Sequence, residues 1–268
     1  MNLALTTVDA FADQPFSGNP AAVCVLSEAH AGIGDHILQA VAAEMNLAET
    51  AILSRVDDGF NLRWFTPTVE VDLCGHATLA AAHVLWEAEY VRRDEPIRFH
   101  TRSGLLIAQV KEGIIELDFP KSAIHTVPMQ DALQQAMGGN ATHMAKTDFD
   151  ALLEFPDADS VRQLTPDFPT LRELTDRGVI ATALSDQPEF DFISRFFAPS
   201  VGVDEDPVTG SAHCALAPYW SEKLGKNELV GYQASARGGI VRVRLEGSRC
   251  VLGGSAITML RGDFNLPD

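Results

Sequence analysis

Two segments of the chain place a glycine and polar side chains at the start of an expected helix. The first is Cys74-Gly75-His76, and the second runs from Asp206 to Ser211. A glycine there lets a ligand approach free backbone N–H groups, and a helix N-terminus carries about half a positive charge. These two features together are typical of an anion site. The segments therefore predict a site for a small carboxylate, although each glycine could also serve only a tight turn.

Three side chains near these segments could move protons. Glu49 lies between a helix expected to end near Asn46 and a strand expected to start at Thr50, where a partly desolvated carboxylate can act as general acid or base. His76 lies in a first helical turn, which favours neutral imidazole. Asp206 could hold a substrate amine or act as a second catalytic group. A purely structural role remains open for each of them: Glu49 as an ordinary loop glutamate, His76 as a turn histidine, and Asp206 as a helix cap.

The cysteines allow a second kind of chemistry. Cys74 precedes a helix N-terminus, where a thiol ionises more readily, so it could act as a thiolate base. The second segment contains no matching cysteine, and Cys214 falls inside the second helix, where packing is expected. The four cysteines form no C-x-x-C pair. They therefore predict neither a metal site nor a secreted disulfide framework.

The chain repeats itself once. Residues 63–72 and 195–204 share six of ten positions, and the 135-residue offset that aligns Gly75 with Gly210 also aligns Arg102 with Arg237. Two copies are too few for a solenoid. We therefore expect two pseudo-symmetric halves, residues 1–120 and 121–268.

The elements expected around these residues are mixed. Apolar spacing predicts a helix over 35–45 that stops at Asn46. The segments 75–86 and 211–220 are apolar all round, which predicts two buried helices. Strands are expected at 3–11, 21–26, 50–53, 61–65, 105–110, 178–184, 189–196, 240–245 and 251–259. The order is not a regular βαβ alternation, and no G-x-G-x-x-G follows the first strand. The prediction is an α+β fold in which each half curls strands around one central helix.

Composition excludes several classes of partner. The 268 residues carry a formal net charge of −17. Such a field repels nucleic acids and anionic membranes. No apolar run approaches the roughly 20 residues that span a bilayer, and the first residues do not read as a signal peptide. We expect a soluble, cytoplasmic protein with no nucleic-acid or membrane partner.

Several motifs, taken in order, resemble those of the PhzF family, named for an enzyme of phenazine biosynthesis. They are Asp9-Ala10-Phe11, Gly18-Asn19-Pro20-Ala21-Ala22-Val23, Met45-Asn46-Leu47-Ala48-Glu49-Thr50, Phe65-Thr66-Pro67 leading to Gly75-His76, and Asp206-Pro207-Val208-Thr209-Gly210-Ser211-Ala212. The resemblance covers essentially the whole chain. It implies the diaminopimelate epimerase fold, a homodimer, and catalysis without metal or organic cofactor, in a cleft between the halves.

The resemblance also implies roles for single residues. Glu49 becomes the general acid/base, with His76, Asp206 and Ser211 as its active-site partners. Gly75 and Gly210 would present backbone N–H groups to the substrate carboxylate, and Asn19 and Thr209 complete the expected binding residues. The implied substrate is trans-2,3-dihydro-3-hydroxyanthranilate or a related cyclic amino acid. The namesake has alanine and proline around its Gly-His pair, where this chain has Cys74 and Ala77, so the substrate is less well supported than the proton transfer.

Two other functions remain open. The chain could be a racemase or epimerase that uses Cys74 as one of two bases. It could also be a non-catalytic protein that binds a small molecule and kept the fold.

Overall fold

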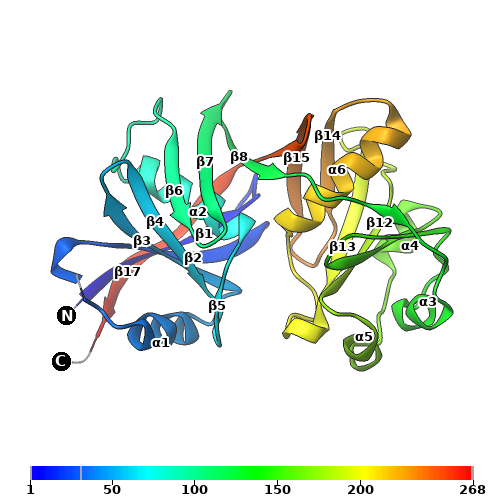
Figure 1. Cartoon of the computed structure of the whole chain (residues 1–268), viewed down its shortest axis with the longest axis horizontal. Helices are drawn as coiled ribbons and strands as arrows, with labels where there is room; N and C mark the ends of the chain where they lie inside the picture. The colour runs from blue at the N-terminus through cyan, green and yellow to red at the C-terminus, as the bar shows by residue number, and fades with distance from the viewer. Residues whose placement is uncertain (1, 31, 267–268) are drawn as a thin grey trace. The chain divides into compact units, whose positions relative to one another are not determined.

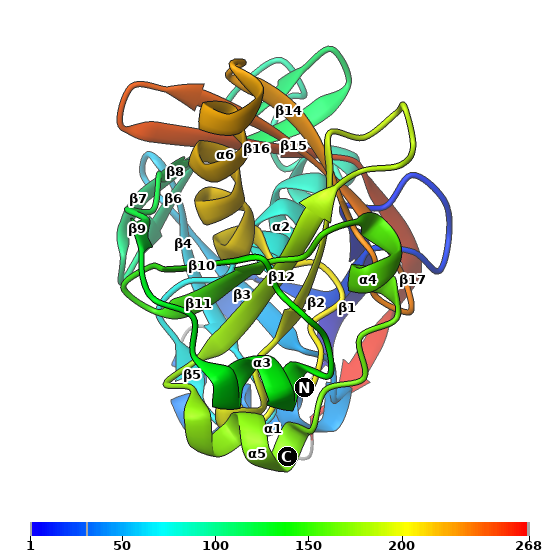
Figure 2. The ribbon, with the colours of Figure 1, turned by 90° about the vertical axis from the view of Figure 1, so that its right-hand side faces the viewer.

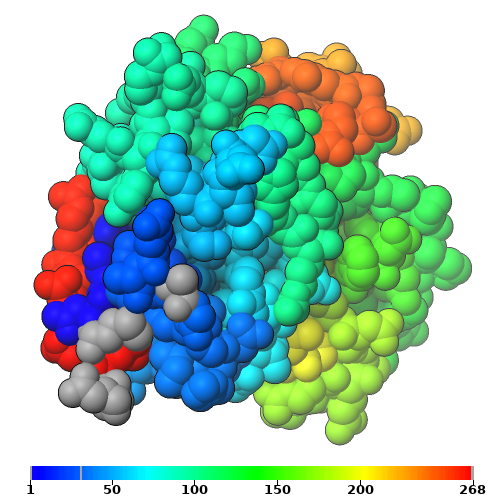
Figure 3. All heavy atoms as spheres, turned by 60° about the vertical axis from the view of Figure 1, so that its left-hand side comes forward, coloured from blue at the N-terminus to red at the C-terminus, as the bar shows by residue number. Residues whose placement is uncertain are grey.

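A computed structural model describes residues 2–30 and 32–266 of the chain. Internal contacts group them into two compact units: unit 1 holds residues 2–118 and 253–266, and unit 2 holds Phe119–Leu252. The expected halves began at residue 1 and ended at residue 268, and both of these residues lie outside the described part of the chain. The expected second half was wrong at its C-terminal end. There β17 (Ala256–Asn265) pairs antiparallel along β1 (Asn2–Ala10), so the red C-terminal strand lies beside the blue N-terminal one (Figure 3).

Unit 1 is a curled sheet, drawn in blue, cyan, green and red in Figure 1. Its further strands are β2 (Asn19–Leu26), β3 (Glu49–Val56), β4 (Gly59–Phe65), β5 (Glu70–Val71), β6 (Ile97–Thr101), β7 (Gly104–Lys111) and β8 (Ile114–Pro120). Along β1-β2-β3-β4-β6-β7 the pairings are antiparallel, parallel, antiparallel, parallel and antiparallel.

Unit 2 repeats this order. Its strands are β9 (His125–Thr126), β10 (His143–Lys146), β11 (Asp150–Glu154), β12 (Gly178–Leu184), β13 (Phe192–Phe197), β14 (Glu228–Gln233), β15 (Gly239–Glu246) and β16 (Arg249–Gly254). Along β10-β11-β12-β13-β14-β15 the pairings are again antiparallel, parallel, antiparallel, parallel and antiparallel. Phe60 pairs with Phe99 in unit 1, and Phe192 pairs with Gly231 in unit 2. Phe192 follows Phe60 by 132 residues, and Gly231 follows Phe99 by the same number. The repeat in the sequence is therefore also a repeat in the fold.

One helix is buried in each unit, as the apolar segments predicted. In unit 1, α2 (Gly75–Glu87) packs against β1, β2 and β3. In unit 2, α6 (Gly210–Leu224) packs against β14 and β15 (Figures 1 and 2). The Trp220 indole of α6 donates a hydrogen bond to Thr182 Oγ1 (3.0 Å) and stacks on Phe192. Each central helix is thereby fixed in a core, so the residues at its first turn have defined positions.

The remaining helices are peripheral. The helix α1 (Asp35–Met45) matches its prediction and ends at Asn46, whose φ of 49° is left-handed. It packs against β3 and β4 and keeps an exposed outer face. The short helices α3 (Asp131–Met137), α4 (Ala158–Arg162) and α5 (Phe168–Leu174), with the 3-10 turns η1 (Glu28–His30) and η2 (Pro199–Val201), were not predicted. Segments of five to seven residues are too short to show a helical apolar period.

Most expected elements differ from the observed ones at one or both ends, and three of these differences have a local cause. The strand expected over 251–259 is interrupted at Ser255, between β16 and β17. The strand expected from residue 189 begins at Phe192, because a turn precedes it in which Phe190 N–H donates to Gln187 O. The helix expected to end at residue 220 continues to Leu224, and its C-cap is Gly225, whose φ is 68°. No helix among the described residues is long and apolar enough to cross a membrane.

Candidate active site

The start of α2 in unit 1 meets the starts of two neighbouring strands. Asn19 opens β2 and Glu49 opens β3, which run parallel and side by side. Cys74 is the N-cap of α2, so His76 lies in its first turn. The turn before Asn19 requires Gly18, because its φ is +69° and a Cβ there would lie 2.2 Å from the Ala10 carbonyl oxygen. The local backbone thus brings four polar side chains from three elements together.

His76 is the centre of this group. Its side chain is buried, with a relative exposure of 4%. Its Nδ1 lies 3.2 Å from Asn19 Nδ2 and 3.5 Å from Cys74 Sγ. Its Nε2 lies 3.3 Å from Glu49 Oε2. The Glu49 side chain is more open, with an exposure of 20%. We call Asn19, Glu49, Cys74 and His76 the histidine group.

Burial fixes the charge of His76. It lowers the pKa of the imidazole to about 3, so the ring is neutral at physiological pH. The Asn19 amide nitrogen can only donate, so Nδ1 accepts and the neutral ring carries its proton on Nε2. This Nε2 is close to Glu49 but not aligned with it, and it forms no hydrogen bond with any described residue. A buried N–H beside a carboxylate is therefore available to a ligand.

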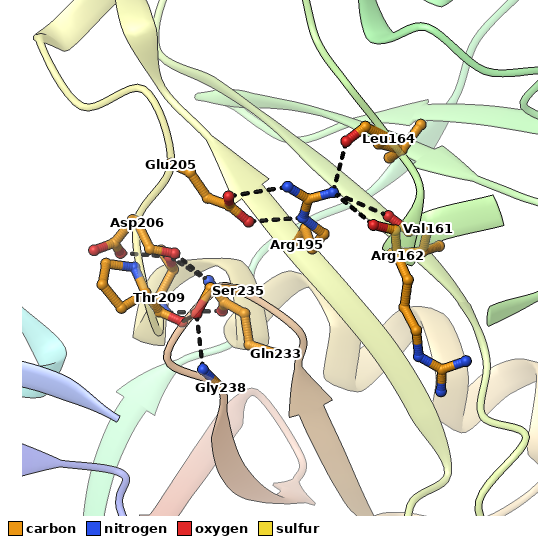
Figure 4. Close-up of polar contacts among 11 residues, drawn as sticks. Val161, Arg162, Leu164, Arg195, Glu205, Asp206, Thr209, Gln233, Ser235 and Gly238 are labelled. Atoms are coloured by element: carbon orange, nitrogen blue, oxygen red, sulfur yellow. Dashed lines mark hydrogen bonds and ion pairs between the residues drawn. The ribbon is translucent and has the colours of Figure 1, made fainter. Parts of the chain in front are cut away.

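A second polar group lies before α6 in unit 2 (Figure 4). The Thr209 hydroxyl donates to Asp206 Oδ2 (2.5 Å), and the Thr209 backbone N–H donates to Gln233 Oε1 (2.9 Å). Gln233 Nε2 in turn donates to the Asp206 carbonyl oxygen (2.7 Å). Gln233 is fully buried. We call Asp206, Thr209 and Gln233 the aspartate group. Gln233 was not among the residues predicted from the sequence, because it lies in β14, 24 residues after Thr209.

An arginine fixes the same loop from its other side (Figure 4). Arg195 in β13 donates to both carboxylate oxygens of Glu205, at 2.7 and 2.9 Å. Its remaining Nη1 donates to three backbone carbonyls, those of Val161, Arg162 and Leu164. Since Glu205 directly precedes Asp206, this ion pair positions the aspartate group.

Unit 1 has a counterpart of this ion pair. Arg63 in β4 donates to both oxygens of Glu70, each at 2.7 Å. These hydrogen bonds from Arg63 hold the pKa of the Glu70 carboxyl below its usual value. The repeat had aligned Arg63 with Arg195, but Glu70 aligns with Gly202, and Glu205 lies just after the aligned segment. The sequence therefore offered a signal for the arginines and none for their partners.

Both central helices begin with uncapped amides. Neither N-cap side chain, that of Cys74 or of Thr209, accepts a hydrogen bond from its helix. The backbone carbonyl of each N-cap residue accepts a hydrogen bond from a side chain four residues later. Thr78 Oγ1 donates to Cys74 O (2.5 Å), and His213 Nδ1 donates to Thr209 O (2.8 Å). The first amides of each helix are thus left without the usual side-chain cap, as an anion site requires.

Each unit gathers its own share of the residues expected from the sequence. Unit 1 brings together Asn19, Glu49, Gly75 and His76, with Cys74 added. Unit 2 brings Asp206 and Thr209 to Gly210, the first residue of α6, followed by half-buried Ser211. One ligand atom each from Glu49, Cys74 and His76 lies within 4.8 Å of the others.

Comparisons with known proteins identify the family and support the fold. A family model described as phenazine biosynthesis-like protein, PhzC-PhzF, matches residues 8–262. An uncharacterized isomerase of Halalkalibacterium halodurans is 48% identical, covering 99% of this chain and 100% of that protein. The crystal structure of a PhzF-family phenazine biosynthesis protein from Enterococcus faecalis is 39% identical with a TM-score of 0.94, covering 99% of this chain and 100% of that chain.

A more distant likeness concerns the fold alone. The structure of a predicted epimerase from Pseudomonas aeruginosa has a TM-score of 0.76 at 20% identity, covering 99% of this chain and 100% of that chain. Together with the nearer relatives, it confirms the expected resemblance and the expected α+β fold of the diaminopimelate epimerase type.

Proposed function

Because the chain belongs to the PhzC-PhzF family of phenazine biosynthesis-like proteins, we propose that it is an isomerase that moves a proton within a small carboxylate substrate, without a cofactor. The observation that carries the proposal is the neutral, buried His76 placed 3.3 Å from the Glu49 carboxylate. A substrate of the kind expected is trans-2,3-dihydro-3-hydroxyanthranilate or a related cyclic amino acid.

Glu49 is the group that moves the proton in this proposal. Its carboxylate removes a proton from one carbon of the substrate, a double bond shifts, and the resulting acid returns the proton to another carbon, so nothing is gained or lost. Its half-buried position leaves it reachable from solvent, while His76 behind it is almost completely buried. Neutral His76 can donate its Nε2 proton to an oxygen that gains charge in the transition state without adding a positive charge of its own.

Each uncapped helix start can bind a carboxylate group through its backbone N–H groups. Backbone N–H groups at Gly75 and at Gly210 or Ser211 are the expected donors. Asp206, fixed by Thr209, is placed to hold a substrate amine or to assist the transfer. Each of these roles follows from the resemblance and is compatible with the contacts within its own unit.

Deuterium exchange tests the proposal. The protein is incubated in deuterated water with trans-2,3-dihydro-3-hydroxyanthranilate and related cyclic amino acids, and NMR follows deuterium entry at carbon and the shift of the double bond. We expect exchange with at least one compound and a loss of about 10²–10⁴-fold in Glu49→Gln, the usual contribution of a general acid/base. Glu44→Gln, an exposed glutamate of α1, is the matched control and should keep the full rate.

Two results would contradict it. A Glu49→Gln variant that retains exchange within a few-fold of the wild type removes Glu49 from the chemistry. Binding of a carboxylate ligand without any exchange by the wild type would favour the non-catalytic binding protein instead.

A second candidate function follows from the position of Cys74. Its sulfur lies 3.5 Å from His76 Nδ1, where a thiolate could be the base of a racemase or epimerase. Thiol alkylation separates the two. Inactivation that substrate prevents would favour the Cys74 base, whereas full activity after alkylation of Cys74 would exclude it.

The proposal includes a homodimer, as the resemblance implies, and a cytoplasmic location, as the sequence composition indicates. Analytical ultracentrifugation at several protein concentrations would measure the oligomeric state. A single monomeric species at every concentration would contradict the dimer.

A further inference from the structure

We propose that Glu49, Cys74 and His76 bind a soft divalent cation of the Zn²⁺ type, and that this cation inhibits the protein rather than assisting it. The first part concerns metal binding alone and rests on the geometry of the three side chains. The second part, inhibition, rests on the proposed function, because it requires Glu49 to be the acid/base.

The distances between the ligand atoms suit one small ion. One atom from each residue lies within 4.8 Å of the others; the Cys74 sulfur lies 3.5 Å from His76 Nδ1, and Glu49 Oε2 lies 3.3 Å from His76 Nε2. Ligand atoms around a tetrahedral zinc ion, with bonds of about 2.0–2.3 Å, are about 3.3–3.6 Å apart. Spacings of up to 4.8 Å are wider than this, so side-chain rotations that bring the Cys74 sulfur from Nδ1 toward Nε2 would complete a three-ligand site.

An independent observation points to a ligand at this place. His76 is 4% exposed, and its buried Nε2 forms no hydrogen bond with any described residue although it lies beside the Glu49 carboxylate. Buried polar atoms are nearly always satisfied in native proteins. A cation placed between Nε2, the carboxylate and the thiolate would satisfy this nitrogen.

The donor set determines which ions fit. Thiolate and imidazole favour Zn²⁺ and similar ions over Mg²⁺ and Ca²⁺, which prefer oxygen ligands. On binding, the sulfur–hydrogen bond of Cys74 breaks, a sulfur–metal bond forms, and the proton passes to the buffer. The thiolate and the carboxylate together then neutralise the two charges of the ion.

Asn19 can support the metal-bound imidazole. A histidine that binds metal through Nε2 carries its proton on Nδ1, which usually donates to a second side chain or carbonyl. The Asn19 amide already lies 3.2 Å from Nδ1. A rotation of the Asn19 amide by about 180° around its Cβ–Cγ bond would place its oxygen, instead of its nitrogen, next to this ring N–H.

The consequence for activity is inhibition. A carboxylate bound to the cation cannot take a proton from substrate, so Glu49 is withdrawn from its proposed role. Three protein ligands would leave the fourth position of the ion open, where a substrate carboxylate or water could bind.

Cobalt spectroscopy tests metal binding without any substrate. Metal-free protein is titrated with Co²⁺, which replaces Zn²⁺ and gives a thiolate-to-cobalt charge-transfer band when sulfur is a ligand. We expect this band in the wild type, its displacement by added Zn²⁺, and its loss in Cys74→Ala. Cys24→Ala is the matched control, because Cys24 is a buried thiol of β2 whose pKa burial raises to about 12, and it should keep the band.

A second variant keeps the test decisive if Cys74→Ala folds poorly, as circular dichroism would reveal. Glu49→Gln should keep the thiolate band and weaken Zn²⁺ binding. The loss of affinity should exceed the 10–100-fold that is typical when a residue hydrogen-bonded to a metal ligand is replaced, because Glu49 would itself be a ligand. No thiolate band in the wild type, or an unchanged band in folded Cys74→Ala, overturns the metal site.

The inhibition is measured separately. Zn²⁺ should suppress deuterium exchange by the wild type, and a chelator should restore it. A thiolate band together with undiminished exchange at saturating Zn²⁺ would overturn the inhibition and leave the metal site standing. A thiolate band in a protein that shows no exchange with any compound would instead count against the proposed function.

Discussion

The two central helices begin with the same backbone arrangement and with different side chains. At the start of α2 the N-cap is Cys74, and the first turn carries a buried neutral histidine beside Glu49. At the start of α6 the N-cap is Thr209, tied to Asp206 and Gln233. Both N-cap carbonyls accept from the side chain four residues on, and neither N-cap side chain caps its helix. Both units thus keep an uncapped helix start, but the side chains around it differ. Unit 1 has the residues to which the proposed function gives the proton transfer, and unit 2 has a hydrogen-bonded loop.

The ion pairs that precede the two helices differ in the same sense. Arg195 donates to Glu205 and to three carbonyls, and its side chain is 13% exposed. Arg63 donates to Glu70 and to Asp35, and its side chain is 30% exposed. The more buried arginine has more partners that would lose a hydrogen bond. The loop of unit 2 should therefore be the more tightly fixed of the two.

Removal of each arginine tests this difference and should give the larger stability effects. Arg195→Met should lower the free energy of unfolding by roughly 3 kcal/mol, because it leaves the half-buried Glu205 and three carbonyls without their donor. Arg63→Met should cost roughly 1 kcal/mol, because solvent screens its more open site. Urea denaturation followed by circular dichroism measures both. Arg92→Met, at an exposed ion pair, is the control and should change stability by less than about 1 kcal/mol. Equal losses for Arg63 and Arg195 would remove the distinction.

Loss of Gln233 should have an intermediate effect that is confined to the aspartate group. Gln233→Met keeps the side-chain volume but leaves the Thr209 N–H and the Asp206 carbonyl without this partner, at about 1–3 kcal/mol for each buried group. We expect a total loss of about 2–3 kcal/mol and, with an active substrate in hand, a raised KM. Gln163→Met, an exposed glutamine of unit 2, should change neither quantity. An unchanged stability and KM in Gln233→Met would show that the loop holds its shape without Gln233.

The buried histidines give a smaller effect that depends on pH. Burial lowers the pKa of His213 to about 4, below its ordinary value near 6.5. The unfolded chain therefore binds a proton more readily than the folded one, so this contribution to stability is complete above pH 6.5 and falls as the pH drops toward 4. At pH 5 the loss should be roughly 2 kcal/mol, from a shift of about 1.4 kcal/mol per unit.

A variant isolates that contribution. His213→Gln should lose less stability than the wild type between pH 7 and pH 5, measured by urea denaturation at each pH. His125→Gln, at an exposed histidine of unit 2, should follow the wild type. His76, whose pKa burial lowers to about 3, contributes a dependence of the same sign and remains in both variants. A pH profile of His213→Gln identical to that of the wild type would contradict the assignment.

Local sequence determined much of the fold. The apolar spacing of 35–45 and the left-handed Asn46 predicted α1 to the residue, since both signals lie within one element. The all-apolar segments predicted α2 and α6, because a helix without a polar face must be buried. The internal repeat predicted that two units share one arrangement, and the matching strand pairings bear this out. The motifs also named Glu49, His76 and Asp206 as residues to consider.

Tertiary structure decided the rest, because the partners come from distant parts of the chain. Only pairing across the sheet places β17 with β1, although these strands stand at opposite ends of the sequence. Only packing brings Cys74 and Glu49 to the same imidazole, and Gln233 to a loop 24 residues before it. Neutral His76 likewise results from burial, which depends on what surrounds a side chain rather than on its neighbours in sequence. The sequence thus specifies which groups are present, and the fold sets their distances and charges.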